Sequence, residues 1–273
     1  MSNAAILSPH VSDAAVLTVS SEVSTLPGSN LLTPEAWQLW RATANSVRLT
    51  FDFGDVVPIS AIGMISLVHS PSARWRALHG YTVNDLIYSP NVALDWTLIS
   101  GAGLPNRTLY PNWRRVAQFS EVSCGALAVE IDDPTHGGAL QAWRFMAGKL
   151  FQPTGNIDHE LGRPIDSADV QEPRFSGGRA TGARGRVPGK AFQWSALTRA
   201  EADHLEDIAR QCGNWRDVLF MLDPADTDRL QRDSVLGPFA PGSPDIADVA
   251  MWPGDGLDLQ MSRASGRIIE SNA

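Results

Sequence analysis

Two consecutive apolar-rich segments near residue 50 constrain the fold more than any other part of the chain. In V-R-L-T-F-D-F, residues 47–53, apolar side chains alternate with charged or hydroxylated ones. This period of two predicts a half-buried antiparallel strand. Gly54 and Asp55 follow as a predicted turn, and residues 59–68 form a second, nearly continuous apolar segment. We therefore expect a β-rich domain that presents loops at its ends.

The central block, residues 30–152, is predicted to be a jelly-roll β-sandwich, because short strands recur in it at regular intervals between turn-forming residues. The predicted strands are residues 47–53, 59–68, 95–100, 116–119, 126–132 and 142–151. Residues 1–29 are rich in Ser, Ala and Val with few charges, and we expect them to form an N-terminal arm or an edge strand.

The chain turns polar and rich in Pro and Gly at residues 153–173, which we predict to be a linker. Residues 174–273 are predicted to form a small α+β domain in which one helix packs on a sheet. The predicted elements of this domain are a hairpin with a long tip at 174–190, a helix at 199–212, and strands at 218–222, 234–236 and 257–261. The predicted fold class is therefore mainly β, with a sandwich and a second α+β domain.

The helix has the clearest sequence signals of any element. Thr198 is followed three residues later by Glu201, which is the pattern of a capping box. Apolar residues then recur at i, i+3, i+4 and i+7 up to Cys212, and Gly213 can end the helix in left-handed geometry. The only other cysteine is Cys124, so the chain is not a disulfide scaffold, and we expect Cys212 to be a buried free thiol.

Composition and charge exclude several classes of function. With 43% hydrophobic and 19% charged residues, the chain is typical of a globular protein. Residues 201–273 carry 14 acidic and 6 basic side chains, which argues against a nucleic-acid-binding face there. No Lys or Arg precedes Arg41, so we expect no signal peptide. The longest apolar run, residues 56–68, is too short to span a membrane, and we expect no membrane insertion.

A search for catalytic and metal-binding patterns finds none that is specific. The sequence contains no H-E-x-x-H, no C-x-x-C and no G-x-S-x-G. A triad of Asp52, His69 and Ser70 stays open, because triads are set by geometry rather than by spacing, although ordinary surface roles are favoured. We predict no catalytic residue, no cofactor and no metal, and therefore a protein that is not an enzyme.

The tryptophans provide the candidate ligand contacts. Five of the nine precede an arginine, an arrangement in which a strand can bury the Trp and expose the Arg. Trp75 and Trp113 flank loop-like sequence, so these two are predicted to contact an external ligand. Core packing is the alternative for each of them.

A basic stretch supplies the candidate interface. Residues 174–199 contain six Lys or Arg and no Asp or Glu. We expect this stretch to contact the acidic residues 201–273 of the next copy of the chain in a ring, and contact with nucleic acid is the alternative. The candidate interface residues are Arg179, Arg184, Arg186 and Lys190.

The central block resembles the galactose-binding-like (discoidin-type) β-sandwich of tail-tip and baseplate proteins from long-tailed bacteriophages. In that family the last two of the matching segments form an antiparallel hairpin that closes the sandwich. The matching segments are N-L-L-T-P-E-A-W-Q-L-W-R at 30–41, L-T-F-D-F-G at 49–54, A-I-G-M-I-S-L-V-H-S at 61–70, A-L-A-V-E-I-D-D-P-T-H-G-G at 126–138 and W-R-F-M-A-G-K-L-F at 143–151.

The second block resembles the sheet-plus-helix ring domains of tail-tube-derived proteins, which include distal tail proteins. Together the two resemblances imply a structural component of a siphovirus-type tail tip or baseplate, made in the bacterial host cytoplasm and located in the virion. Its implied partners are other copies of itself in a hexameric ring, other tail proteins and host-surface glycan, without specific nucleic-acid binding. The alternative is a carbohydrate-binding protein with a discoidin-like module, and an esterase or glycosidase is a third class.

Overall fold

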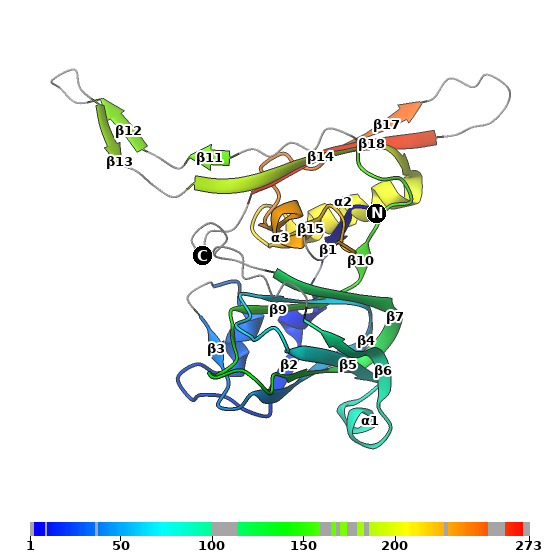
Figure 1. Ribbon diagram of the computed structural model, residues 1–273. Coiled ribbons are helices and arrows are strands. Elements are labelled where there is room, and N and C mark those ends of the chain that lie inside the picture. The colour runs from blue at the N-terminus through cyan, green and yellow to red at the C-terminus, as the bar shows by residue number, and fades with distance from the viewer. Residues whose placement is uncertain are drawn as a thin grey trace. The chain divides into compact units, whose positions relative to one another are not determined.

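The structure, a computed structural model (Figure 1), is mainly β, and the predicted fold class is confirmed. It divides into two compact units, one containing Met1–Gln152 with Met221–Asp233 and the other containing Pro153–Phe220 with Ser234–Asn272. The residues that the structure describes are 3–8, 10–35, 38–99, 114–158, 165–167, 170–173, 179–182, 186–226, 229–250 and 260–269.

The first unit is built around one long antiparallel sheet with strand order β2-β4-β7-β5-β6, in which β9 also pairs with β4. Smaller strand pairs are β3–β8 and β1–β10. Because β2 is the edge strand beside β4, part of the predicted N-terminal arm belongs to this sheet. The elements are β1 (Ala5–Leu7), η1 (Val11–Ala14), β2 (Val16–Val19), η2 (Gly28–Leu32), β3 (Trp40–Arg41), β4 (Ser46–Ile65), β5 (Arg74–Gly80), α1 (Val83–Tyr88), β6 (Asn91–Leu98), β7 (Arg114–Asp132), β8 (Gln141–Ala142), β9 (Arg144–Gly148), β10 (Leu150–Phe151) and α3 (Leu230–Asp233).

Strand β4 runs through the position where the sequence predicted a turn. Gly54 has φ +75° and donates its N–H to Asp52 Oδ1 over 3.0 Å. Its neighbours nevertheless continue along the same partner, because Asp52 pairs with Ala126 and Val57 pairs with Cys124, both on β7. The glycine therefore produces a bulge that bends β4 and does not reverse the chain. The predicted turn at this point is wrong.

The core of the sandwich lies between the first half of β4 and strand β9. Phe51 and Phe145 are fully buried and stack with ring centroids 4.2 Å apart. Strand β9 pairs with β4, and between residues 126 and 132 both edges of β7 are occupied by β4 and β5. The hairpin of 126–138 with 143–151 that the resemblance implied is therefore wrong, since β7 has no free edge for β9 there.

Helix α1 covers one end of the outer face of the sheet and was not predicted. Thr82 accepts a hydrogen bond from the backbone N–H of Asp85, and the Asp85 carboxylate accepts one from the N–H of Thr82 in return. This is a capping box that uses Asp in place of Glu. Leu86 of the helix is buried in a small cluster with Leu78, Ala126 and Ala128.

The second unit contains a four-stranded antiparallel sheet of order β11-β14-β18-β17, with α2 packed on β14 and β18 (Figure 1). Strands β12 and β13 form a separate hairpin, so the predicted linker 153–173 contains strand structure. The elements are β11 (Ile165–Ser167), β12 (Val170–Pro173), β13 (Arg179–Gly182), β14 (Arg186–Thr198), α2 (Arg199–Cys212), β15 (Val218–Met221), β16 (Ser234–Gly237), β17 (Asp245–Ala250) and β18 (Gln260–Ile269).

Helix α2 forms as the sequence predicts. It begins after the N-cap Thr198, buries the stripe that ends at Cys212, and is followed by Gly213 with φ +57°. Cys212 is a buried thiol that is not part of a disulfide, as expected. On β14 the aromatic rings of Phe192 and Trp194 face inward, and Phe192 stacks on Phe220 of β15 at 5.2 Å. The predicted helix and the predicted strand at 218–222 are confirmed.

Glu201 is expected to make this helix sensitive to acid. Burial acts to raise the pKa of its carboxyl, but hydrogen bonds from Thr154 and Thr198 outweigh burial and lower the pKa from 4.5 to about 2. Glu201→Gln should lower the free energy of unfolding by about 1 kcal/mol at neutral pH. Because the folded pKa is the lower one, this contribution is present above pH 4.5 and is lost as pH falls towards 2.

The measurement is urea unfolding of the whole chain, followed by circular dichroism at neutral pH and at about pH 3. The difference between wild type and Glu201→Gln should shrink at the lower pH. Glu206→Gln is the control, because Glu206 lies on the same helix and makes a solvent-exposed ion pair with Arg210 at 2.6 Å, which contributes about 0.5 kcal/mol or less. An equal effect of both substitutions would contradict the capping role of Glu201.

Candidate functional site

The outer face of the sheet in the first unit carries a network of paired charges. In the register of β4, β7 and β5, Arg48 and Arg76 lie on either side of Glu130. Arg48 Nη1 is 3.4 Å from Glu130 Oε1, and Arg76 Nε is 2.5 Å from Glu130 Oε2. Two residues along the strands, Arg74 Nη2 is 2.9 Å from Asp132 Oδ2. We call these five residues the charge network.

Ion pairs this exposed contribute at most about 1 kcal/mol each to stability. Their structural consequence is orientation, since each guanidinium and carboxylate is held at a defined place above the strands. The network contains three positive and two negative groups, so it is close to electrically neutral. Preoriented, nearly neutral polar groups are suited to hydrogen-bonding an uncharged polar ligand.

Trp96 of β6 lies beside this network. The pairing of β5 with β6 shifts register between Trp75 and Ala77, which brings Trp96 alongside the two arginines of β5. The Cζ atoms of Arg74 and Arg76 are 4.9 and 4.8 Å from the centroid of the indole ring. These cation–π contacts hold the ring in place, and the residue remains only half-buried.

A groove of about 390 Å³ opens at this point, which we call the Trp96 groove. It combines an aromatic ring, two carboxylates, a guanidinium and two hydroxyls, which is a few polar groups around one apolar platform. The Ser20 hydroxyl at its edge accepts a hydrogen bond from the backbone N–H of Arg48 over 2.9 Å. The groove is lined by Ser20, Ser46, Val47, Arg48, Trp96, Glu130 and Asp132.

A second polar cluster fastens two loops of the first unit together. The Asp133 carboxylate is fully buried and accepts hydrogen bonds from the backbone N–H of Ser70, over 2.7 Å, and from the Ser70 hydroxyl. The hydroxyls of Ser72 and Thr135 join the cluster, each in contact with Ser70 at 2.9 Å. The loop before β5 is thereby tied to the loop that follows β7.

His69 does not serve Ser70 as a base. Its Nε2 accepts from Arg115 Nε over 2.9 Å, so its Nδ1–H donates to the Ser70 carbonyl at 2.7 Å. Burial, together with the nearby Arg115 charge, lowers the pKa of His69 and keeps the ring neutral, although the bond to Ser70 acts in the opposite direction. Since the Ser70 hydroxyl donates to Asp133, and Asp52 Oδ1 accepts from Gly54, the residues of the possible triad are not arranged as one.

One of the two tryptophans predicted to contact a ligand is buried in the core. Trp75 is 2% exposed and belongs to the main hydrophobic core, so it cannot meet an external ligand. The reason is the alternation of β5, which points Arg74 and Arg76 outward and Trp75 inward. Trp113 lies outside the described residues. Trp96 was missed because its polar neighbours Asp95 and Thr97 give it the same alternating pattern as the buried Trp75, and this pattern predicts an inward-facing ring.

Of the candidate interface residues, only Lys190 has a described side chain. Lys190 is 6% exposed on β14, so it is not available as a surface contact. Arg179 and Arg186 are the first residues of β13 and β14, which belong to different strand pairs. Arg184 lies outside the described residues. Contact of this stretch with a neighbouring copy stays a prediction.

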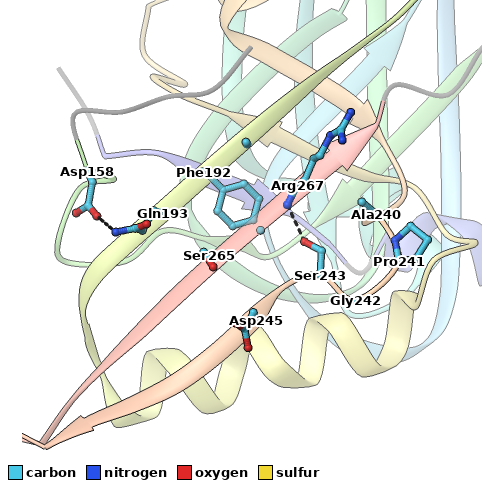
Figure 2. A pocket seen from close by; sticks show the side chains of 12 residues that line it. Asp158, Phe192, Gln193, Ala240, Pro241, Gly242, Ser243, Asp245, Ser265 and Arg267 are labelled. Atoms are coloured by element: carbon cyan, nitrogen blue, oxygen red, sulfur yellow. Dashed lines mark hydrogen bonds between the residues drawn. The ribbon is translucent and has the colours of Figure 1, made fainter. Parts of the chain in front are cut away.

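The second unit has a groove of its own, of about 700 Å³, beside β14 and β18 (Figure 2). Several of its polar groups are already engaged with each other, since Gln193 donates to Asp158 over 2.7 Å and Ser243 Oγ accepts from the backbone N–H of Arg267 over 2.6 Å. Its aromatic residue, Phe192, is 3% exposed. This groove therefore lacks an accessible aromatic face, and the Trp96 groove is the stronger candidate for ligand binding.

The described part of the chain shows neither a metal-binding cluster nor a membrane-spanning helix. No group of three or more His, Cys, Asp or Glu side chains is placed to hold a metal ion there. No helix among the described residues has the length and apolar character needed to cross a membrane.

Comparison with known proteins finds likeness in structure only. No family model matches the chain, and no curated protein does. A chitosan-binding module of a chitosanase/glucanase from Paenibacillus sp. IK-5 is 9% identical with TM-score 0.39, covering 52% of this chain and 100% of that one. The family 32 carbohydrate-binding module of C. perfringens NanJ, in complex with galactose, is 12% identical with TM-score 0.40, covering 52% and 98%.

A third solved neighbour is the family 32 module of AlyQ in complex with 4,5-unsaturated mannuronic acid, which is 13% identical with TM-score 0.38 and covers 48% of this chain and 92% of that one. These neighbours are carbohydrate-binding modules with a galactose-binding-like β-sandwich. Likeness at this level is one of fold and assigns no ligand to this chain. The neighbours give no support to the tail-tip role, the ring or the virion location, which stay predictions.

Proposed function

We propose that the first unit binds a carbohydrate, without catalysis, in the Trp96 groove. The observation that carries the proposal is the half-buried Trp96 ring set among the paired side chains of the charge network. The faces of a pyranose ring present both C–H groups and hydroxyls. A fixed aromatic ring packs against the C–H groups, while carboxylates, guanidinium groups and serine hydroxyls exchange hydrogen bonds with the hydroxyls.

The arrangement favours an uncharged ligand over a strongly charged one. Each carboxylate in the groove already has an arginine partner, and Glu130 has two. An anion would meet Glu130 and Asp132, and a cation would meet the three arginines, so either would disturb pairs that already exist. Hydroxyl groups can accept from the guanidinium N–H groups and donate to the carboxylate oxygens without breaking the pairs.

Trp96→Ala tests this proposal. The wild-type chain is first screened on an array of mono- and oligosaccharides, and the sugar it retains best is titrated by calorimetry. Because Trp is often a hot-spot residue of binding sites, its truncation should reduce the binding free energy by about 2 kcal/mol or more, which is roughly a 30-fold loss of affinity. The absence of any bound sugar, or unchanged affinity of Trp96→Ala, would overturn the proposal.

Trp215→Ala is the matched control for this experiment. Trp215 belongs to the second unit, is 69% exposed, and has Arg216 Cζ 4.5 Å from its ring centroid. It therefore shares the arginine contact of Trp96 and is more exposed, but it does not line the Trp96 groove. We expect its substitution to leave the affinity for sugar unchanged.

A role in a phage tail tip remains compatible with sugar binding, since a tail tip meets the host surface. We infer this role from the sequence resemblance alone. Light scattering of the purified chain tests it, because a ring of six copies is expected to have six times the mass of the 29.5 kDa chain.

A further inference from the structure

An apolar hollow adjoins the Trp96 groove on the outer face of the first unit. It has a volume of about 420 Å³ and lies between β2, β4 and α1. Val16 and Ile87, which line it from β2 and α1, are 70% and 61% exposed. Val83 adds a third apolar side chain, and Thr18 and Thr50 also line the hollow. We call this site the apolar hollow.

The hollow and the groove are continuous through one side chain. Arg48 lines both of them. Its Nη1 reaches Glu130 in the charge network, and its Nη2 donates to the carbonyl of Leu86 at 3.0 Å, so the guanidinium bridges from the sheet to α1. The Arg48 side chain is thereby held at the boundary between the polar Trp96 groove and the apolar hollow.

The strands set the distance between the two compartments. In the pairing of β2 with β4, Val16 lies opposite Asp52 at the hollow, and the N–H of Ser20 bonds to the carbonyl of Arg48 beside the groove. Four residues of a β-strand span roughly 13 Å. This is the separation between the Ser20 side of the groove and Val16 in the hollow, and a sugar ring that carries a short chain spans such a length.

We propose that the ligand of this face is a glycan bearing an apolar substituent, an acyl or alkyl chain, whose sugar ring lies on Trp96 and whose chain enters the apolar hollow. The inference rests on the proposed sugar-binding function and names the class of sugar. Lone exposed apolar residues need no explanation, but these three line one hollow next to a polar groove. A chain that covers them gains roughly fourfold in affinity for each methylene removed from water.

The size of the hollow favours a substituent over a protein partner. Stable contacts between proteins bury on the order of 800 Å² on each side, whereas this hollow offers three apolar side chains bordered by Arg48 and Asp52. Such a charged border suits a narrow chain that passes between the polar groups. It does not suit a broad apolar surface that would cover and desolvate them.

The test uses methyl, butyl and hexyl β-glycosides of glucose, galactose and N-acetylglucosamine, titrated into the full chain and followed by NMR. The Trp96 indole signal reports on the groove, and the methyl signals of Val16, Val83 and Ile87 report on the hollow. We expect the methyl glycoside of at least one sugar to shift the indole signal alone. The butyl glycoside of the same sugar should also shift the three methyl signals and bind at least about tenfold more tightly.

Val16→Ser and Ile87→Ser should remove this gain and leave the affinity for the methyl glycoside unchanged. Val56→Ser is the matched control, because Val56 is 56% exposed on β4 and does not line the hollow. A shift at Trp96 without any gain from the alkyl chain would overturn the inference and leave sugar binding intact. A chain effect without a shift at Trp96, or no shift with any of the nine probes, would overturn both.

Discussion

Substitution of Phe145 with alanine is expected to lower the free energy of unfolding by about 3–5 kcal/mol. Phe145 is fully buried on β9 and stacks on Phe51 with centroids 4.2 Å apart. Truncation removes apolar contacts and leaves a cavity between strands that cannot move independently, because β9 and β4 are hydrogen-bonded to each other. Since typical domains are stable by only 5–15 kcal/mol, this loss is a substantial part of the total free energy of unfolding.

Urea unfolding followed by near-ultraviolet circular dichroism measures this effect, since that signal reports on aromatic packing. Phe53→Ala is the control, because Phe53 lies on the same strand as Phe51 but is only partly buried. Its effect should be less than half as large. An effect of Phe145→Ala below about 1 kcal/mol would mean that β9 does not close the sandwich core in solution.

The second large effect is expected for Asp133→Ala, which should destabilise the protein by about 2–4 kcal/mol. The Asp133 carboxylate is fully buried and accepts from both the backbone N–H and the hydroxyl of Ser70. Alanine would leave the half-buried backbone N–H of Ser70 without this acceptor, while the Ser70 hydroxyl would keep only its contacts with Ser72 and Thr135, and a donor left unpaired costs more than the loss of the bond itself. Asp133→Asn keeps a carbonyl oxygen as an acceptor, so it should recover part of the stability.

The neighbouring Asp132, the last residue of β7, provides a control. Asp132 pairs with Arg74 at 2.9 Å on the solvent-exposed face, so Asp132→Ala should change the free energy of unfolding by about 1 kcal/mol or less. The same substitution removes a carboxylate of the Trp96 groove and should weaken sugar binding. We thus expect the two substitutions to have different effects: Asp133→Ala should mainly lower stability, and Asp132→Ala should mainly weaken sugar binding. Equal losses of stability would contradict the role of Asp133 as the tie between the loops.

Local signals were sufficient wherever the deciding interactions lie within a few residues. Helix α2 could be predicted from Thr198, Glu201 and Gly213, because the capping box and the helix end are made by neighbours in the chain. The alternation of residues 47–53 likewise predicted a half-buried strand, and Val47, Leu49 and Phe51 are all buried. Helix α1 could have been found in the same way, since Thr82 and Asp85 form a capping box of their own.

Sequence signals failed where the conformation or pairing of a segment depends on a strand that is distant in the chain. Gly54 with Asp55 has the composition of a turn, and only the pairing of both flanking segments with β7 makes it a bulge. The partner of β9 depends on which strand edges are free, and β7 has none at residues 126–132. Neither fact is encoded within a short window of sequence.

The candidate site depended on tertiary structure almost entirely. Trp75 and Trp96 have similar polar neighbours in sequence, but Trp75 is 2% exposed and Trp96 is half-buried on the outer face. The charge network joins residues 48, 74, 76, 130 and 132, which meet only because β4, β7 and β5 are adjacent in register.

By itself, the sequence determined that this protein is mainly β, that one capped helix packs on the second sheet, and which face of residues 47–53 is buried. These properties follow from the spacing of apolar side chains and from helix capping, and both are determined by residues only a few positions apart in the chain. Tertiary structure alone decided the bulge at Gly54, the partner of β9, and the meeting of Trp96 with Arg74 and Arg76. Such contacts depend on the register between strands far apart in the chain, and register is set by the packing of the whole sheet.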